Sequence, residues 1–349
     1  MPNENKILIS WSEISAWCTC RMKHYWQYQY EHPRANNGRL GIEKRKGDRA
    51  PSVGSCGHEA VSAFIKEEDW EKAVDNWFER EIALRPLFDE EIEEYREVTR
   101  LVKNIIPRYL DKYKDEKFKP VAVEQELMLP LPGASNTYLR VYIDAIMEDN
   151  TGHLWLWEHK FPQKVFRDED SVELDGQIGT YQYAAHKNGY NVIGTVYNQL
   201  LARLPSIPKT NKDGSLSRAK IYTDWDTYSK AVLDEGKDPA DYLEMQEKLQ
   251  DFEFFKRYYI YRSLKEVKLF ARDMQRRIWD LKKKKNHIYM SESAINCRGC
   301  SFKELCLERV QGGDVEYLVT LDYIPKLSRE EKAEEGHDGY EEETEWVSV

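Results

Sequence analysis

Three charged residues stand close together in the stretch Val141–Lys160, which has the alternating pattern of two β-strands around a tight turn. In the second strand successive side chains point to opposite faces, so Glu158 and Lys160 share one face. If residues 150–152 form a three-residue loop with the glycine in the left-handed conformation, the register places Asp144 opposite Glu158. The sequence therefore predicts a β-hairpin that gathers two carboxylates and one ammonium group in a single patch.

This patch has the composition of a metal-dependent hydrolytic site. Neighbouring carboxylates repel each other, and Mg²⁺ or Mn²⁺ relieves that repulsion while keeping water ligands for a phosphate substrate. In phosphodiester hydrolysis, Asp144 and Glu158 would hold the metal, and the main-chain carbonyl of His159 would add a ligand. Lys160 would orient the attacking water or stabilise the developing charge. The alternative is an amphipathic hairpin with a solvent-exposed salt bridge, because charges of both signs commonly alternate on exposed strands.

The composition indicates a soluble globular protein. The chain has 349 residues, of which 41% are hydrophobic and 12% aromatic, which is ample for a core. It lacks an apolar run of about 18 residues and a signal sequence, so we expect a cytoplasmic protein without a membrane partner. The net charge of −10 argues against bulk attraction to nucleic acid. We interpret residues 329–349 as an acidic disordered tail after a single domain at 1–328.

Three cysteines near the C-terminus have the spacing of a metal or iron–sulfur site. Cys297, Cys300 and Cys306 form a C-x2-C-x5-C pattern that requires a fourth ligand from elsewhere. Disulfides are not expected in a chain without an export signal. The fourth ligand must come from the other end of the chain, where Cys18 and Cys20 are both candidates. Zinc is the alternative to an iron–sulfur cluster.

Helical periodicity and breaker residues suggest the elements before the hairpin. We expect an aromatic-rich helix over Ile9–Tyr30, capped by Ser12 or Ser15, and then a polar loop over His32–Ser52. A second helix is expected to open at Gly54.

That second helix is expected to run to Phe64, with His58 in its first turn. The segment Glu67–Lys117 is helical in period, and we predict breaks near Pro86 and Pro107.

A strand over Val121–Leu129 leads into the hairpin, and Glu124 and Glu126 on it are second-rank candidates for the metal site. After the hairpin, a buried strand over Val192–Leu201 is expected, and Tyr222–Trp279 reads as helical.

Between these two segments, Gln177 and Tyr181 share one face of a helix that starts near Asp175 and ends at Gly189, because they are four residues apart.

Taken together, these stretches resemble the PD-(D/E)XK nuclease superfamily, specifically its RecB-like branch with an iron–sulfur cluster. That branch includes the CRISPR-associated adaptation nucleases and phage exonucleases. The resemblance covers about residues 11–30, 54–64, 121–200 and 295–309, in the order of the family. The matching motifs are Ser12-x-Ile14-Ser15-x-Trp17-x-x-Cys20, Gly54-x-x-Gly57-His58, Asp144, Glu158-His159-Lys160, Gln177-x-x-x-Tyr181 and the trio Cys297, Cys300 and Cys306.

The resemblance implies an α/β fold with a restriction-endonuclease-like core, in which a mixed central β-sheet is flanked by helices. A helical insertion would occupy about 66–117 and a cluster-binding segment about 286–310. The resemblance also implies that a [4Fe–4S] cluster joins the N- and C-terminal segments. Its four ligands would be Cys20, Cys297, Cys300 and Cys306.

The resemblance further implies which side chains form the catalytic site. A histidine and two carboxylates would hold one or two Mg²⁺ or Mn²⁺ ions, and a lysine would stand beside the attacking water. A glutamine and a tyrosine would position the DNA strand or support the lysine. These side chains are His58, Asp144, Glu158, Lys160, Gln177 and Tyr181.

We therefore expect a metal-dependent deoxyribonuclease, an exonuclease acting on single strands or duplex ends in phage or bacterial DNA recombination or processing. DNA is the expected partner, and a helicase or recombination protein is a further candidate. One alternative is a non-catalytic DNA-binding or partner protein that retains the fold, although such a protein has no evident reason to keep two repelling carboxylates together. Another is a zinc-stabilised interaction module without nuclease activity.

Overall fold

The computed structural model describes residues 6–326 except 36–39, 47–48, 132–135, 164–165, 220–221 and 250–251, so the tail predicted at 329–349 lies outside the described residues. The elements are, in chain order, β1 (Ile7–Ser10), α1 (Trp11–Thr19), α2 (Arg21–Tyr28), β2 (Ile42–Lys44), α3 (Arg49–Ile65), α4 (Trp70–Ala83), α5 (Asp89–Lys112), β3 (Phe118–Pro130), β4 (Thr137–Asp149), β5 (Leu154–Lys160), α6 (Glu169–Glu173), α7 (Gly176–Lys187), β6 (Val192–Leu200), α8 (Trp225–Asp234), η1 (Pro239–Tyr242), α9 (Leu243–Leu249), β7 (Phe255–Tyr261), α10 (Leu264–Lys284), α11 (Ala294–Arg298), α12 (Lys303–Gln311), α13 (Val315–Asp322) and β8 (Tyr323–Pro325).

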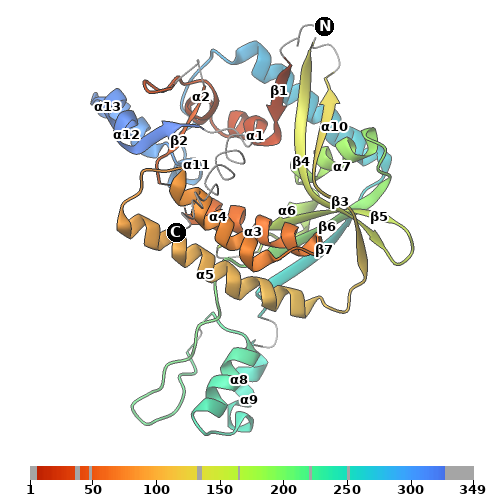
Figure 1. Ribbon diagram of the computed structural model, residues 1–349, viewed down its shortest axis with the longest axis vertical. Coiled ribbons are helices and arrows are strands. Elements are labelled where there is room, and N and C mark those ends of the chain that lie inside the picture. Colours follow the sequence, from red (N-terminus) through yellow and green to blue (C-terminus); the bar gives the residue numbers. More distant parts are fainter. Residues whose placement is uncertain are drawn as a thin grey trace, which may run out of the picture.

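A six-stranded mixed sheet forms the centre of the molecule, with helices on its flanks (Figure 1). Its strand order is β1-β4-β5-β6-β7, and β3 also pairs with β4. Because β3 runs along almost the whole of β4, the two other partners of β4 must share its second edge. Parallel β1 pairs with residues 137–140 and antiparallel β5 with residues 145–148, so residues 141–144 lie in the fork between them. The mixed α/β architecture fits the expected restriction-endonuclease-like core.

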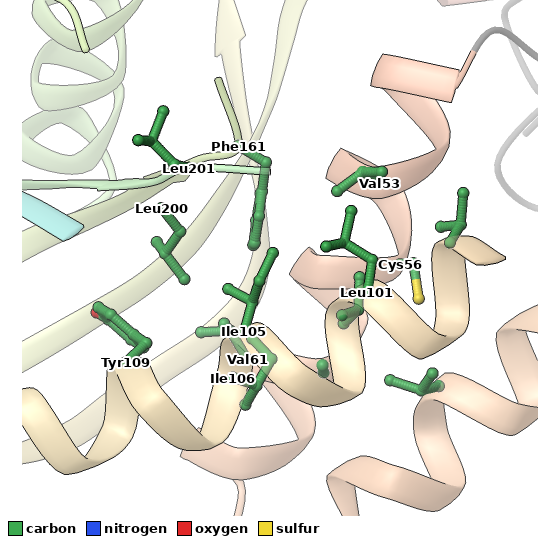
Figure 2. Close-up of a cluster of buried hydrophobic side chains, with 14 of the residues drawn as sticks. Val53, Cys56, Val61, Leu101, Ile105, Ile106, Tyr109, Phe161, Leu200 and Leu201 are labelled. Carbon is green, nitrogen blue, oxygen red and sulfur yellow. The ribbon is translucent and has the colours of Figure 1, made fainter. Parts of the chain in front are cut away.

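Helices α3, α4 and α5 pack together with residues that follow β5 and β6 in one apolar cluster (Figure 2). The predicted break near Pro86 is confirmed, since α4 ends before it and α5 begins after it. The predicted break at Pro107 is wrong, because α5 continues through it. Its neighbours Ile105, Ile106 and Tyr109 are buried in the cluster, and this packing outweighs the missing helical hydrogen bond.

The N-terminal segment differs from the single helix predicted over Ile9–Tyr30. Its first residues belong to β1, whose pairing with β4 is a long-range contact that local periodicity does not reveal. The helix cap is Ser10, which accepts from the N–H of Glu13 at 3.2 Å, and neither Ser12 nor Ser15 serves as the cap. Cys20, in extended conformation, then separates α1 from α2.

The loop predicted over His32–Ser52 contains the strand β2, which pairs with β8, and also the start of α3. Helix α3 begins at Arg49 instead of Gly54, since Pro51 falls in its first turn, where a missing N–H costs little. His58 therefore lies in the helix interior and not in the first turn.

The region predicted as helical over Tyr222–Trp279 contains α8, η1, α9 and α10, but also the strand β7. The aromatic run in β7 pairs antiparallel with β6 and extends the sheet, which explains its enrichment in ring side chains. The predictions for the hairpin partner strand and for α7 and β6 are confirmed, and Gly189 follows α7 with a φ of +90°. None of the described helices is long and apolar enough to cross a membrane.

Candidate active site

The hairpin has the predicted register. The paired residues run from Ala145–Trp157 to Glu148–Leu154, and Gly152 in the connecting loop has a φ of +83°. One further step of this register sets Asp144 opposite Glu158, as the loop length predicts. The N–H of His159 donates to Oδ2 of Asp144 at 2.7 Å, which holds the two strands together at this level.

Glu158 is a buried carboxylate of which only one oxygen is hydrogen-bonded. Only 3% of its side chain is exposed, and Oε1 accepts from Nζ of Lys160. Oε2 is buried without a hydrogen-bond partner among the described residues. Burial raises the pKa of Glu158 to about 7, with Asp144 adding to the rise and Lys160 opposing it. An unsatisfied buried carboxylate oxygen is a costly feature that a bound cation would relieve.

Asp144 is surrounded by two histidines. Its Oδ2 lies 3.3 Å from Nδ1 of His58 and 3.4 Å from Nδ1 of His159. Burial acts to raise the pKa of Asp144, but the two histidines outweigh it and hold this pKa well below its usual range. Burial acts to lower the pKa of His58, but the neighbouring Asp144 outweighs burial and raises this pKa. At His159 burial is the stronger effect, and the pKa is lowered. Asp144 is therefore ionised in this arrangement.

A close helix–strand approach brings His58 to Asp144. A Cβ atom on Gly57 would lie 2.3 Å from the ring of Phe161, the residue that follows β5. With the Phe161 ring in this position only glycine fits, which lets α3 lie directly against the residue that follows β5. The ring of His58 then contacts the edge of the Phe161 ring at a centroid distance of 5.6 Å.

A buried polar network supports the hairpin on the side of His159. Its Nε2 lies 3.3 Å from the hydroxyl of Tyr109, which accepts from Arg257 at 2.8 Å. Arg257 also donates from Nε to Asn198 at 2.5 Å, and the amide of Asn198 lies 3.4 Å from the carbonyl oxygen of Glu158. Sequence reasoning missed Tyr109, Asn198 and Arg257, because in the sequence they show only the periodicity of packing residues.

Helix α7 places Gln177 and Tyr181 beside the charged pair. Asp175 caps the helix by accepting from the N–H of Gln177 at 2.7 Å. The side chain of Gln177 accepts from Lys160 and donates to Glu158, each at 3.4 Å. Tyr181, one turn later, is buried, and this burial raises the pKa of its hydroxyl. The helix face predicted from the i, i+4 spacing therefore points at the hairpin.

These side chains line a pocket of about 630 Å³. All six predicted side chains take part, namely His58, Asp144, Glu158, Lys160, Gln177 and Tyr181.

Of the two second-rank candidates, Glu124 lines the pocket and has a φ of +50°. Glu126 accepts a hydrogen bond from Tyr142 at 2.7 Å and is not part of the lining. An ion pair of Glu59 with Arg80 at the pocket wall was not predicted from the sequence. The position of Glu59 directly after the histidine motif was the available signal.

No three His, Cys, Asp or Glu side chains of the described residues stand in a geometry ready to hold a metal ion. At the hairpin, the rings of His58 and His159 contact Oδ2 of Asp144, and Lys160 forms an ion pair with Oε1 of Glu158. The donor set nevertheless fits Mg²⁺ or Mn²⁺, because it combines two adjacent carboxylates, a histidine and the unpartnered oxygen of Glu158.

The predicted cysteine ligands lie where the two ends of the chain meet. Cys20, Cys300 and Cys306 pack against one apolar cluster formed by α2, β2, α12, α13 and β8. Burial raises the pKa of Cys306 to about 11, with Cys300, Cys20 and Cys297 adding to the rise. Cys18 is exposed and lines a different pocket. Among the described residues, these cysteines do not form a group of three that could hold a metal ion.

Comparisons with known proteins give a family match and a distant likeness to a solved structure. One of the solved structures that the chain resembles is titled "Crystal structure of SSO0001". The match covers 73% of this chain and 82% of that one, with 11% identity and a TM-score of 0.29. No curated protein matches the chain. The model of the PD-(D/E)XK nuclease superfamily matches residues 8–307, a span from β1 to α12 that contains the hairpin, its pocket and all six cysteines. By this match, the chain belongs to the PD-(D/E)XK nuclease superfamily.

Proposed function

We propose that the protein is a Mg²⁺- or Mn²⁺-dependent deoxyribonuclease that hydrolyses phosphodiester bonds. The observation that carries this proposal is the buried Glu158, whose Oε2 has no partner among the described residues while Asp144 and Lys160 stand beside it. Membership of a superfamily whose members are generally metal-dependent nucleases supports it. A carboxylate pair that is costly without a cation is the arrangement expected of such a site.

The donors that would hold the metal are His58, Asp144, Glu158 and the main-chain carbonyl of His159. A bound Mg²⁺ or Mn²⁺ supplies Lewis acidity to the scissile phosphate and lowers the pKa of a water. Lys160 keeps its ammonium charged, because the nearby carboxylates outweigh burial and raise its pKa. That ammonium would orient the attacking water or stabilise charge on the phosphate.

Two further groups would act through Lys160 or on the substrate strand. Gln177 contacts both Lys160 and Glu158, so it would fix the distance between them. Tyr181 lines the pocket one helical turn away and would contact the strand. We further propose exonuclease action on single strands or duplex ends in phage or bacterial DNA recombination, with a helicase or recombination protein as a candidate partner. This finer assignment rests on the motif resemblance.

The proposal is tested with end-labelled and circular nucleic acids. Anaerobically purified protein with Mn²⁺ should shorten linear single-stranded DNA from an end, and EDTA should abolish the reaction. Single-stranded circles of the same sequence, which have no ends, should survive. Cutting of the circles would indicate an endonuclease, and faster cutting of a matched RNA would overturn the DNA assignment. A folded protein that binds the DNA without cutting it would favour the non-catalytic DNA-binding alternative.

We also propose that Cys20, Cys297, Cys300 and Cys306 hold a [4Fe–4S] cluster, with zinc as the alternative. Cys20 lies in the same apolar cluster as Cys300 and Cys306. A metal bridge between the two ends would restrict the unfolded chain over most of its length, so its role would be structural.

Two serine variants test the cluster assignment. We expect Cys20→Ser to lose bound metal and melt at a lower temperature than wild type, because a ligand is removed. Cys18→Ser is the matched control, since this cysteine is exposed, and it should keep both properties. Iron and zinc analysis of the anaerobic protein identifies the metal, and metal loss in Cys18→Ser alone would reverse the assignment.

A further inference from the structure

A second pocket adjoins the candidate active site. It has a volume of about 390 Å³ and shares Tyr142, Gln177 and Tyr181 with the first pocket. Its remaining lining comes from Ser10 at the end of β1, from α1 and α2, and from Arg140 of β4. Arg140 is paired with Ser10 of β1 at the position where the fork between β1 and β5 opens. The two pockets therefore form adjoining parts of one surface that begins at the catalytic hairpin.

The lining of the second pocket is basic, in contrast to the first. Among the described residues its lining includes the cations Lys23 and Arg140 and no carboxylate. Lys23 is half-buried, and it makes no ion pair with any residue that the structure describes. In a chain of net charge −10, a lining with two cations and no carboxylate marks a local preference for an anion.

Neutral hydrogen-bonding groups complete this lining. The hydroxyls of Ser12 and Ser15 line it together with the first turn of α1, where the helix dipole also favours negative charge. The amide oxygen of Gln27, in the same lining, is buried without a hydrogen-bond partner among the described residues. Because this oxygen is an acceptor and a phosphate diester has no donor, a water that accompanies the ligand would complete it. Cations, hydroxyls and a helix N-terminus are the groups that hold phosphates of nucleic acids.

We propose that this second pocket is a phosphate subsite that holds the nucleic-acid strand beside the scissile bond. The inference rests on the proposed nuclease function, because the substrate at the hairpin defines the ligand here. The shared wall formed by Gln177 and Tyr181 would set the distance between the bound phosphate and the reacting one. The ligand is a phosphate group of the strand, either an internal diester or a terminal monoester.

The test compares Lys23→Ala and Arg140→Gln with the control Lys230→Ala, which removes an exposed charge from α8, far from both pockets (Figure 1). KM for a linear oligonucleotide, measured with Mn²⁺, should rise about tenfold in each subsite variant, as expected for a lost charged hydrogen bond. The dependence of log KM on log salt should become shallower by about 0.7 for each cation removed. Arg140→Lys should restore part of the affinity, which separates the role of the charge from a folding defect.

Oligonucleotides with and without a 5′- or 3′-phosphate distinguish the two ligand sources. A KM effect confined to one phosphorylated end would assign the subsite to a strand terminus, and an effect on all substrates would assign it to an internal phosphate. If wild type cleaves DNA while both subsite variants keep the KM and salt dependence of Lys230→Ala, the subsite proposal is wrong and the nuclease proposal stands. If wild type cleaves no nucleic acid, the nuclease proposal itself fails.

Discussion

Replacing Lys160 with alanine is expected to reduce kcat for DNA cleavage by about 10²–10³-fold, the usual effect of removing one group that stabilises transition-state charge. Its Nζ contacts Oε1 of Glu158 and lies 3.4 Å from Oε1 of Gln177, so the ammonium is held in place before substrate arrives. Substrate binding should change little, because subsite contacts remain. The measurement is single-turnover cleavage of end-labelled DNA with saturating Mn²⁺, together with DNA affinity.

The matched control is Lys265→Ala, which removes an exposed lysine near the start of α10. It should cleave DNA like wild type, and both variants should melt close to the wild-type temperature. A Lys160→Ala protein that keeps wild-type kcat would show that the hairpin lysine is not catalytic and would refute the site assignment.

The second large effect is expected for Glu158→Gln, which keeps the shape of the side chain and removes its charge. Because Glu158 supplies a carboxylate to the proposed metal site, affinity for Mn²⁺ should fall at least about 100-fold, and cleavage should be lost. Isothermal titration of the metal-free protein with Mn²⁺ measures the affinity directly. Undiminished Mn²⁺ binding by the variant would place the metal elsewhere.

The same substitution should change how stability depends on pH. Burial raises the pKa of Glu158 from 4.5 to about 7, so the folded state binds this proton more tightly than the unfolded state does. The free energy of unfolding of metal-free wild type should therefore fall as the pH rises from about 4.5 to about 7, by on the order of 3 kcal/mol for this group. Glutamine does not titrate, so the variant should lack this component.

The comparison is made by chemical denaturation of both metal-free proteins between pH 5 and pH 8. Their difference in unfolding free energy should shift in favour of the variant as the pH rises. Adding Mn²⁺ at pH 8 should shift the difference back in favour of wild type, because only wild type gains stability from binding it. A constant difference across this pH range would mean that Glu158 is not a buried carboxylate of raised pKa.

The grouping of Asp144, Glu158 and Lys160 could be predicted from the sequence, because it depends on strand alternation and on the length of one turn. Alternation in β5 puts Glu158 and Lys160 on one face, and the three-residue loop fixes their register with Asp144. The spacing of Gln177 and Tyr181 gives them one face of α7. Each of these relations depends on neighbours a few residues apart, so strand and helix periods are sufficient to predict it.

Other elements were misjudged where packing overrode local signals. Pro107 does not end α5, because buried neighbours hold the helix together. The strand β7 lies within a region that is predicted to be helical. Its position is set by pairing with β6, which local periodicity does not reveal. The start of α3 was placed too late, although Pro51 is well tolerated in a first helical turn.

The sequence by itself determined the chemistry of the hairpin and the charges that it gathers, because strand alternation and turn length act over a short stretch of chain. Only the tertiary structure decided that His58 meets Asp144, through the contact of Gly57 with Phe161. Only the tertiary structure brought Lys23 and Arg140 to one pocket beside the hairpin. These residues are far apart in the chain, and their proximity follows from how α3 packs against Phe161 and how β1 and β5 divide one edge of β4.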